Sequence, residues 1–215
     1  MNGPSPKARA AARALARLDP AWRMPLRQLE PYPGFPTPAL ARRSHFEQLA
    51  RAIVYQQLAG KAARAIFQRV RALGGNGRFP SAERLLQIPE ERLRGAGLSR
   101  NKLRSLQDLA RRVLDGRLRL RSLGRLPDEE VVEHLVQVRG IGPWTAQMHL
   151  IFKLGRPDVF APQDLGLQEG IRRLDRLAGR PGPAEAAARA EAWRPWRSVA
   201  CWYLWRLAEL RTPDS

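Results

Sequence analysis

The chain has 215 residues and a net charge of +18, with 38 lysines and arginines against 20 aspartates and glutamates. This length suits one large domain or two small ones, and 44% hydrophobic residues can fill a core, which argues against a disordered basic tail. The single cysteine, Cys201, excludes an intramolecular disulfide, a four-cysteine zinc site and a four-cysteine iron–sulfur cluster, while the lack of a long apolar run excludes a membrane-spanning helix.

Hydrophobic periodicity predicts helices along nearly the whole chain. The first is expected over residues 6–18, and the prolines between Pro31 and Pro38 then make a rigid connector. Further on, apolar residues recur three and four positions apart, as on one face of a helix, while convincing two-residue alternation is absent. These helical stripes are Phe46–Val54, Ala63–Val70, Leu103–Leu114, Val131–Val136, Leu167–Ala178 and Trp196–Leu207.

The pattern predicts an all-α fold of two helical subdomains with a cleft between them. Residues 1–40, which hold the first helix and the connector, are expected to pack on the C-terminal subdomain. Residues 41–154 are expected to form a helical subdomain that carries a helix-hairpin-helix motif, and residues 155–215 to form the subdomain that completes the cleft.

The strong positive charge indicates nucleic acid as the partner. Arginine and lysine neutralise phosphates and release counterions, which supplies affinity without sequence preference. A general arginine bias with no particular ligand is the alternative, and charge alone does not decide between them.

A glycine-rich segment, Val138–Gly142, lies between two short predicted helices and is expected to form a hairpin. Gly140 and Gly142 permit positive φ and close approach by another backbone, and Pro143 suits the first position of a helix. Amides exposed at the start of that helix would attract a phosphate, although an ordinary helix–turn–helix corner is the alternative. The carbonyl groups that could jointly hold a monovalent cation here are those of Val136, Val138 and Ile141.

Several segments, in the same order, carry a resemblance to a known family. They are Ala52–Leu58 (AIVYQQL), Gly97–Lys102 (GLSRNK), Gly140–Ala146 (GIGPWTA), Pro157–Asp164 (PDVFAPQD) and Trp193–Ser198 (WRPWRS). Together they resemble the helix-hairpin-helix DNA glycosylase superfamily, and within it the 3-methyladenine DNA glycosylase II branch. The likeness spans residues 44–210, so the amino-terminal mixed α/β domain of some members has no counterpart and a compact form is expected.

The resemblance implies a base-excision repair enzyme that flips alkylated bases, such as 3-methyladenine and 7-methylguanine, out of double-stranded DNA. It would hydrolyse the N-glycosidic bond and leave an abasic site, as a monomer with no required cofactor and no iron–sulfur cluster. The expected location is the bacterial cytoplasm, or an organelle or the nucleus in a eukaryote. Two alternatives stay open: a non-catalytic helix-hairpin-helix DNA-binding protein, and a glycosylase for uracil or mismatched bases.

Asp164 is the candidate catalytic residue, because the resemblance implies an aspartate shortly after the hairpin. Cleaving an N-glycosidic bond builds positive charge on the sugar, which a carboxylate in a dry pocket stabilises. The same carboxylate could orient or deprotonate the attacking water. From the residues alone, Asp164 also fits the N-cap of the following helix, and the two roles are compatible.

Two positions depart from the family pattern. Gln163 stands where many relatives carry a second acidic residue, which removes like-charge repulsion, so activity is expected to survive. Trp144 stands where bifunctional members carry a lysine that forms a Schiff base. We therefore predict a monofunctional hydrolase that does not nick the strand.

The resemblance implies a base pocket lined by Trp144, Trp205 and Tyr55. Met148, four residues after Trp144, shares its helix face and is assigned to the same pocket. Cationic alkylated purines are attracted to indole faces by about 0.5–2 kcal/mol per contact. Core packing is the alternative for both tryptophans, and it is the interpretation preferred for Trp193, Trp196 and Trp202.

Gln57 or Leu58 is the candidate wedge that fills the gap left by the flipped base, because the turn after an apolar helix points a side chain outward. A polar helix end is the alternative. Arg100 and Lys102 are expected to contact phosphate, although solvated charges would give the same pattern. The remaining DNA-backbone contacts are assigned to Arg139, Gly140, Ile141, Gly142 and Thr145.

The three histidines, His45, His134 and His149, lack the tight spacing of a metal site. Cys201 lies among apolar residues and is expected in the core.

Overall fold

A computed structural model describes residues 5–75 and 77–210, and every regular element in these ranges is helical, which confirms the predicted all-α class. The described part of Met1–Thr37 and that of Leu150–Ser215 together form one compact unit, unit 1. Pro38–His149 forms the second, unit 2. Across these described ranges, no helix is both long enough and apolar enough to cross a membrane.

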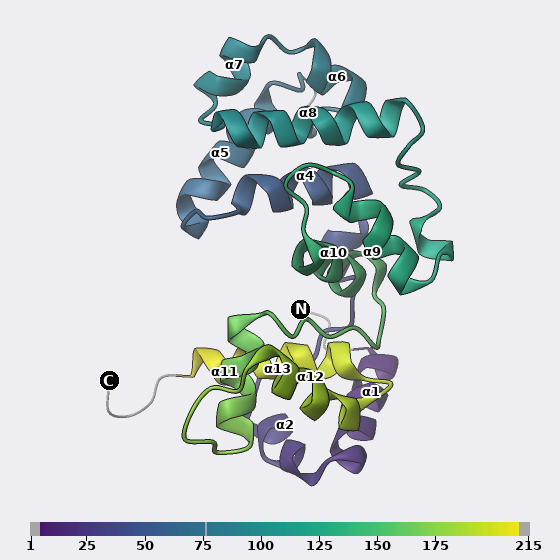
Figure 1. Ribbon diagram of the computed structural model, residues 1–215, viewed down its shortest axis with the longest axis vertical. Helices are drawn as coiled ribbons and strands as arrows, with labels where there is room; N and C mark the ends of the chain where they lie inside the picture. The colour runs from purple at the N-terminus through teal and green to yellow at the C-terminus, as the bar shows by residue number, and fades with distance from the viewer. Residues whose placement is uncertain (1–4, 76, 211–215) are drawn as a thin grey trace. The chain divides into compact units, whose positions relative to one another are not determined.

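Unit 1 joins an amino-terminal and a carboxyl-terminal segment (Figure 1). Its core forms where α13 packs against α11, α1 and α2, around the buried Trp22, Trp193 and Tyr203. The rings of Trp22 and Trp193 meet edge to face with centroids 5.2 Å apart. The elements of unit 1 are α1 (Pro6–Leu18), η1 (Pro20–Arg23), α2 (Pro25–Gln28), the π-helical η3 (Leu150–Leu154), α11 (Leu165–Leu174), α12 (Pro183–Ala190), η4 (Glu191–Trp193) and α13 (Arg197–Glu209).

Unit 2 is organised around its longest helix, α8, which packs against α4, α6 and α7 (Figure 1). Ser99 caps the start of α8 by accepting a hydrogen bond from the Lys102 amide at 3.3 Å. The apolar stripe of α8 is buried at Leu103, Leu106 and Leu109. The elements of unit 2 are α3 (Pro38–Ala41), α4 (His45–Tyr55), α5 (Gly60–Ala72), α6 (Ala82–Gln87), α7 (Glu90–Gly95), α8 (Arg100–Leu114), η2 (Leu123–Arg125), α9 (Asp128–Val136) and α10 (Pro143–His149).

The helix over residues 6–18 and the six periodic stripes are all observed, but two stripes are shorter than predicted. Leu114 is 53% exposed, so the buried face of α8 ends before it. α11 stops at Leu174, because the chain turns at Arg176 with a φ of +55° and Ala178 lies exposed beyond it. Five short helices were not predicted, since one turn or two cannot display a repeat: α2, α3, α6, α7 and α12.

Candidate active site and nucleic-acid interface

Asp164 is half-buried at the head of α11, in unit 1. Its Oδ1 atom accepts a hydrogen bond from the Leu167 amide at 2.9 Å, which confirms the predicted N-cap. The same oxygen accepts a second hydrogen bond from Nε1 of Trp205 at 3.1 Å. The carboxylate is therefore held in one orientation by a main-chain donor and an indole donor.

Trp205 owes its position to two residues whose role the sequence did not reveal. Its indole stacks on Phe152 from η3, with centroids 5.4 Å apart and an interplanar angle of 23°. A Cβ atom on Gly166 would lie 3.0 Å from Cδ1 of Trp205 and 3.1 Å from Oδ1 of Asp164. Glycine at 166 thus allows the indole to reach the carboxylate. A glycine in the first turn of a helix is the only signal that sequence offered.

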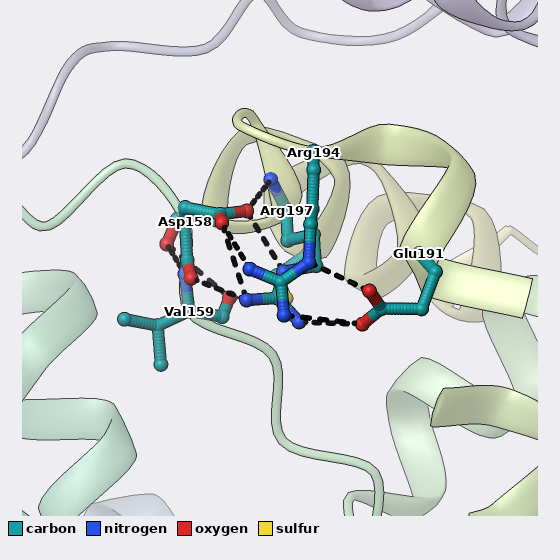
Figure 2. A network of polar contacts seen from close by, with 7 residues as sticks. Asp158, Val159, Glu191, Arg194 and Arg197 are labelled. Atoms are coloured by element: carbon teal, nitrogen blue, oxygen red, sulfur yellow. Dashed lines mark hydrogen bonds and ion pairs between the residues drawn. The ribbon is translucent and has the colours of Figure 1, made fainter. Parts of the chain in front are cut away.

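The segment that leads to Asp164 is clamped to the start of α13 by ion pairs (Figure 2). Arg197 donates to both carboxylate oxygens of Asp158, from Nε at 2.8 Å and from Nη2 at 3.2 Å, and Nη2 also reaches the Asp158 carbonyl. Arg194 donates to the same carboxylate at 2.9 Å. Both arginines also pair with Glu191, so the cluster is a closed network. It joins two segments that carry the family resemblance, Pro157–Asp164 and Trp193–Ser198.

Buried polar contacts also join this segment to α13. The Val159 amide donates to Oγ of Ser198 at 3.0 Å, and that hydroxyl lies 3.3 Å from the Val159 carbonyl. Sγ of Cys201 lies 3.6 Å from the same carbonyl. Cys201 is buried in the core as predicted, and burial raises the pKa of its thiol. The backbone five residues before Asp164 is therefore fixed from two sides.

The predicted hairpin lies between α9 and α10 in unit 2. Gly140 has a φ of +79°, and a Cβ atom there would lie 2.7 Å from Oγ of Ser105, so this position requires glycine twice over. The Arg139 amide donates to Oδ2 of Asp108 at 2.8 Å, and the Ile141 amide donates to the Val138 carbonyl at 3.0 Å. The backbone of the hairpin is thus held in shape by its own turn and by α8.

The residues assigned to the DNA backbone differ in solvent exposure. Arg139 is exposed, as are Gly140, Gly142 and Arg100, so these positions can be reached by a ligand. The Thr145 side chain is only 5% exposed, and the Ile141 side chain is buried too. The assignment of these two residues to the DNA backbone stays a prediction.

The wedge turn, residues 56–60, follows α4. Gln57 has a φ of +54°, and both Gln57 and Leu58 are exposed, which leaves either side chain free to project. Lys102 makes main-chain contacts that the sequence did not indicate. Its Nζ atom donates to the carbonyls of Val54 at 2.6 Å and Gln56 at 2.8 Å, which uses two of its three N–H donors. A phosphate contact by Lys102 stays a prediction.

The residues assigned to the base pocket differ in exposure. Trp144 is 45% exposed on unit 2, where Met148 and Tyr55 are half-buried, and the guanidinium of Arg51 lies 3.8 Å from the Tyr55 ring centroid. Trp205, on unit 1, is the pocket candidate in contact with Asp164. The assignment of all four to a base pocket stays a prediction.

Of the three tryptophans expected in the core, Trp193 is fully buried, whereas Trp196 and Trp202 are only half-buried. Nε1 of Trp202 donates to the Glu30 carbonyl at 3.2 Å, and Arg206 lies over its ring. The partial exposure of Trp202 follows from its amphipathic character, because the ring packs while its N–H and one face meet polar groups.

Two histidines that lie far apart in the sequence meet in unit 2. Nδ1 of His45 lies 3.0 Å from Nε2 of His149, a pairing that no sequence spacing indicated. His134 is exposed on α9. Within residues 5–75 and 77–210, no group of three or more His, Cys, Asp or Glu side chains could hold a metal ion.

Comparison with known proteins gives consistent matches. Residues 50–197 match the family model described as HhH-GPD superfamily base excision DNA repair protein. DNA-3-methyladenine glycosylase 1 of Schizosaccharomyces pombe is 36% identical over 197 residues, which cover 91% of this chain and 86% of the relative. A solved structure of 3-methyladenine DNA glycosylase from the same yeast, in complex with abasic DNA, superposes with a TM-score of 0.84 and covers 94% of this chain and 97% of its own. DNA-3-methyladenine glycosidase of Bacillus halodurans, 33% identical, superposes with a TM-score of 0.82 and covers 95% of this chain and 90% of its own.

Proposed function

The chain belongs to the HhH-GPD superfamily of base excision DNA repair proteins, and on this premise we propose that it is a DNA glycosylase that releases alkylated bases from double-stranded DNA. The substrates proposed first are 3-methyladenine and 7-methylguanine. The enzyme flips the damaged nucleotide out of the stack, hydrolyses its N-glycosidic bond and leaves an abasic site. The observation that supports this best is the half-buried carboxylate of Asp164, oriented by the Leu167 amide and the Trp205 indole.

The charge balance of the reaction explains why one carboxylate is enough. A purine alkylated at N3 or N7 is cationic, so when its bond to C1′ breaks, the electron pair stays on the base and the base leaves neutral. No group needs to protonate it. The positive charge moves to the sugar, where the Asp164 carboxylate stabilises it, and a water then bonds to C1′ and gives up a proton to Asp164 or to solvent.

We propose that the enzyme is a hydrolase without lyase activity. A lyase needs an amine to form a Schiff base with the sugar, and Trp144 in the hairpin helix has none to offer. Borohydride added to the enzyme during turnover of lesion DNA should trap no covalent complex. A trapped complex would contradict this part of the proposal.

We propose further that the enzyme acts as a monomer and that its chemistry requires no cofactor, because a carboxylate and water suffice. A Na⁺ or K⁺ ion at the hairpin would serve binding, by bridging main-chain carbonyls to a phosphate. The Val138 carbonyl already accepts the Ile141 amide, and its second lone pair remains for an ion. The other ligands proposed for this ion are the main-chain carbonyl oxygens of Val136 and Ile141.

The decisive experiment compares the wild type with Asp164→Asn for release of methylated bases from alkylated duplex DNA. Asn keeps the shape and the cap but removes the charge, so release should fall by about 10²–10⁴-fold while duplex binding is retained. Asp115→Asn, which removes an exposed carboxylate in unit 2, is the matched control. Equal release by wild type and Asp164→Asn would remove Asp164 from the mechanism, and release of uracil alone would redirect the substrate assignment.

A further inference from the structure

One face of α8 carries three polar side chains that the proposed mechanism does not use. Lys102, Ser105 and Asp108 are spaced three residues apart, so they follow one another along the helix. Ser105 is buried, and the other two are half-buried. Each of them contacts either the wedge turn or the hairpin, the two exposed loops of unit 2 assigned to DNA.

Lys102 forms hydrogen bonds with the main chain where the wedge turn begins. The carbonyls at the end of a helix have no partner within it, and Lys102 donates to those of Val54 and Gln56 at the end of α4. Gln57, with its positive φ, comes directly after the second of these carbonyls. Burial lowers the pKa of Lys102, as expected for an ammonium group taken partly out of water to make these contacts.

Ser105 and Asp108 contact the main chain of the hairpin. A Cβ atom on Gly140 would lie 2.7 Å from Oγ of Ser105, so Ser105 packs closely against this glycine. Asp108 accepts a hydrogen bond from the Arg139 amide at 2.8 Å. The carboxylate of Asp108 is itself held by Nε of Arg112 at 3.0 Å, one helical turn further along. The hairpin backbone is therefore docked on α8.

A direct hydrogen bond also connects the wedge turn to the hairpin. Nε2 of Gln56, the first residue of the wedge turn, donates to the Gly140 carbonyl of the hairpin at 2.8 Å. The turn is thus tied to the hairpin once directly and once through α8. Every atom of this circuit lies in unit 2.

We propose that Lys102 is a positioning residue, which holds the wedge turn at a fixed distance from the hairpin and does not bind phosphate. A duplex gripped by its backbone at the hairpin then meets Gln57 and Leu58 at a set offset, and an error of about 1 Å in such placement is enough to slow a reaction by about 10²-fold. This inference rests on the proposed function, which supplies the wedge and the duplex.

The test uses Lys102→Met, which keeps the aliphatic stem and removes the ammonium, in the full-length protein. Single-turnover release of methylated base should fall about tenfold or more, since charged hydrogen bonds to two carbonyls are lost. Affinity for undamaged duplex should stay within about threefold, and its log–log salt slope should not change, whereas loss of a phosphate contact would lower that slope by about 0.9. Lys7→Met, an exposed lysine on α1, is the matched control for loss of one charge.

Lys102→Arg separates the two roles by rescue. A guanidinium binds phosphate well, so arginine would restore a phosphate contact, but its planar fork does not place donors on both carbonyls in the space of an ammonium group. We expect Lys102→Arg to remain impaired in release. Gln56→Leu, which cuts the direct tie to Gly140, should slow release in the same direction, and the double variant should lose less than the two single losses combined.

Wedge insertion is measured without catalysis by 2-aminopurine placed opposite an abasic-site analogue in a duplex. Lys102→Met should reduce the fluorescence change on binding, measured at a temperature at which circular dichroism shows both it and Lys7→Met to be folded. If the wild type releases no methylated base, the proposed function fails, yet the fluorescence and salt-slope comparisons still test the positioning role. A Lys102→Met variant with a lower salt slope, or one with wild-type fluorescence and release, would overturn the inference.

Discussion

Units 1 and 2 hold their candidate functional groups by different means. In unit 1, ion pairs among side chains fix the segment before Asp164, with Arg197 and Arg194 both on Asp158. In unit 2, side chains of α8 bind the main chain of the turn and the hairpin, as Lys102 and Asp108 do.

The difference follows from what each unit is proposed to present. A reactive carboxylate must have its own direction set, and strong charge-assisted bonds around its loop achieve this. A surface that follows a phosphate backbone must instead keep its own backbone in shape and leave amides and short side chains outward. Substitutions in unit 1 should therefore affect excision first, and substitutions in unit 2 should affect binding or placement first.

The largest effect outside Asp164 is expected from Arg197→Met. Removing this 15% exposed guanidinium leaves the Asp158 carboxylate with fewer partners in a poorly solvated place, so the free energy of unfolding should fall by about 3 kcal/mol. Base release should fall as well, because the segment before Asp164 loosens. Urea unfolding and single-turnover release measure both, with Arg117→Met, at an exposed pair with Asp115, as the control. If the free energy of unfolding falls no more than in the control, ion pairs do not hold the segment before Asp164 in unit 1.

Gly140→Ala is the corresponding change in unit 2. Alanine would have to adopt a φ of +79° and would also overlap Oγ of Ser105, which together should cost about 2 kcal/mol. Affinity for undamaged duplex, measured by fluorescence anisotropy, should fall about tenfold or more. Gly95→Ala, where an added Cβ would meet nothing, should bind as the wild type does. Intact duplex affinity in Gly140→Ala would remove the hairpin from the interface.

Gly166→Ala sharpens the contrast, because this glycine lies beside the carboxylate. An added methyl group would press on the Trp205 indole and Oδ1 of Asp164, and a shift of either should slow release about tenfold, or about 1.4 kcal/mol. Duplex affinity should be unchanged, the opposite of the result for Gly140→Ala. Gly179→Ala, with open space around its Cβ, is the control in unit 1. A loss of affinity without a loss of rate would contradict the assignment.

The smallest effect concerns acid stability in unit 1. Arg172 and Arg173 lower the pKa of Glu169 from 4.5 to about 2. Because the folded-state pKa is lower than that of the unfolded chain, the stabilisation is complete above about pH 4.5 and is lost as the pH falls towards 2. Glu169→Gln should reduce the free energy of unfolding at pH 7 by about 1 kcal/mol, after allowance for solvent screening, and should flatten its decline below pH 4.5. Glu83→Gln, on an exposed position of α6, should leave the pH profile unaltered.

Sequence reasoning predicted the all-α class, the long helices and the capping role of Asp164, because periodicity and caps are local signals. Contacts between distant segments could not be predicted in the same way. Gln56 and Gly140 are 84 residues apart, and nothing in the sequence of either indicates their hydrogen bond. The same holds for His45 and His149, whose pairing depends on how α4 and α10 pack.

The role proposed for Lys102 differs from the one that its sequence suggests, for a definite physical reason. A lysine in a basic sequence beside an expected DNA surface is reasonably predicted to bind phosphate, since sequence reports the charge but not the direction of the side chain. Only the tertiary structure reveals unsatisfied helix-terminal carbonyls within its reach. For Trp205, the family resemblance named the residue as a pocket candidate. Its indole hydrogen bond to Asp164 depends on the packing of α13 against α11 and could not be predicted from the sequence.

The burial of Cys201 has a consequence for how long the protein survives under chemical stress. Methylating agents attack thiolates before most other groups in proteins, and the only thiol of this chain is buried in the core with its pKa raised, so it remains protonated and out of reach. Methylating agents therefore find no accessible thiolate in this chain. Inactivation through alkylation of a thiol is thus not expected for a protein of this design.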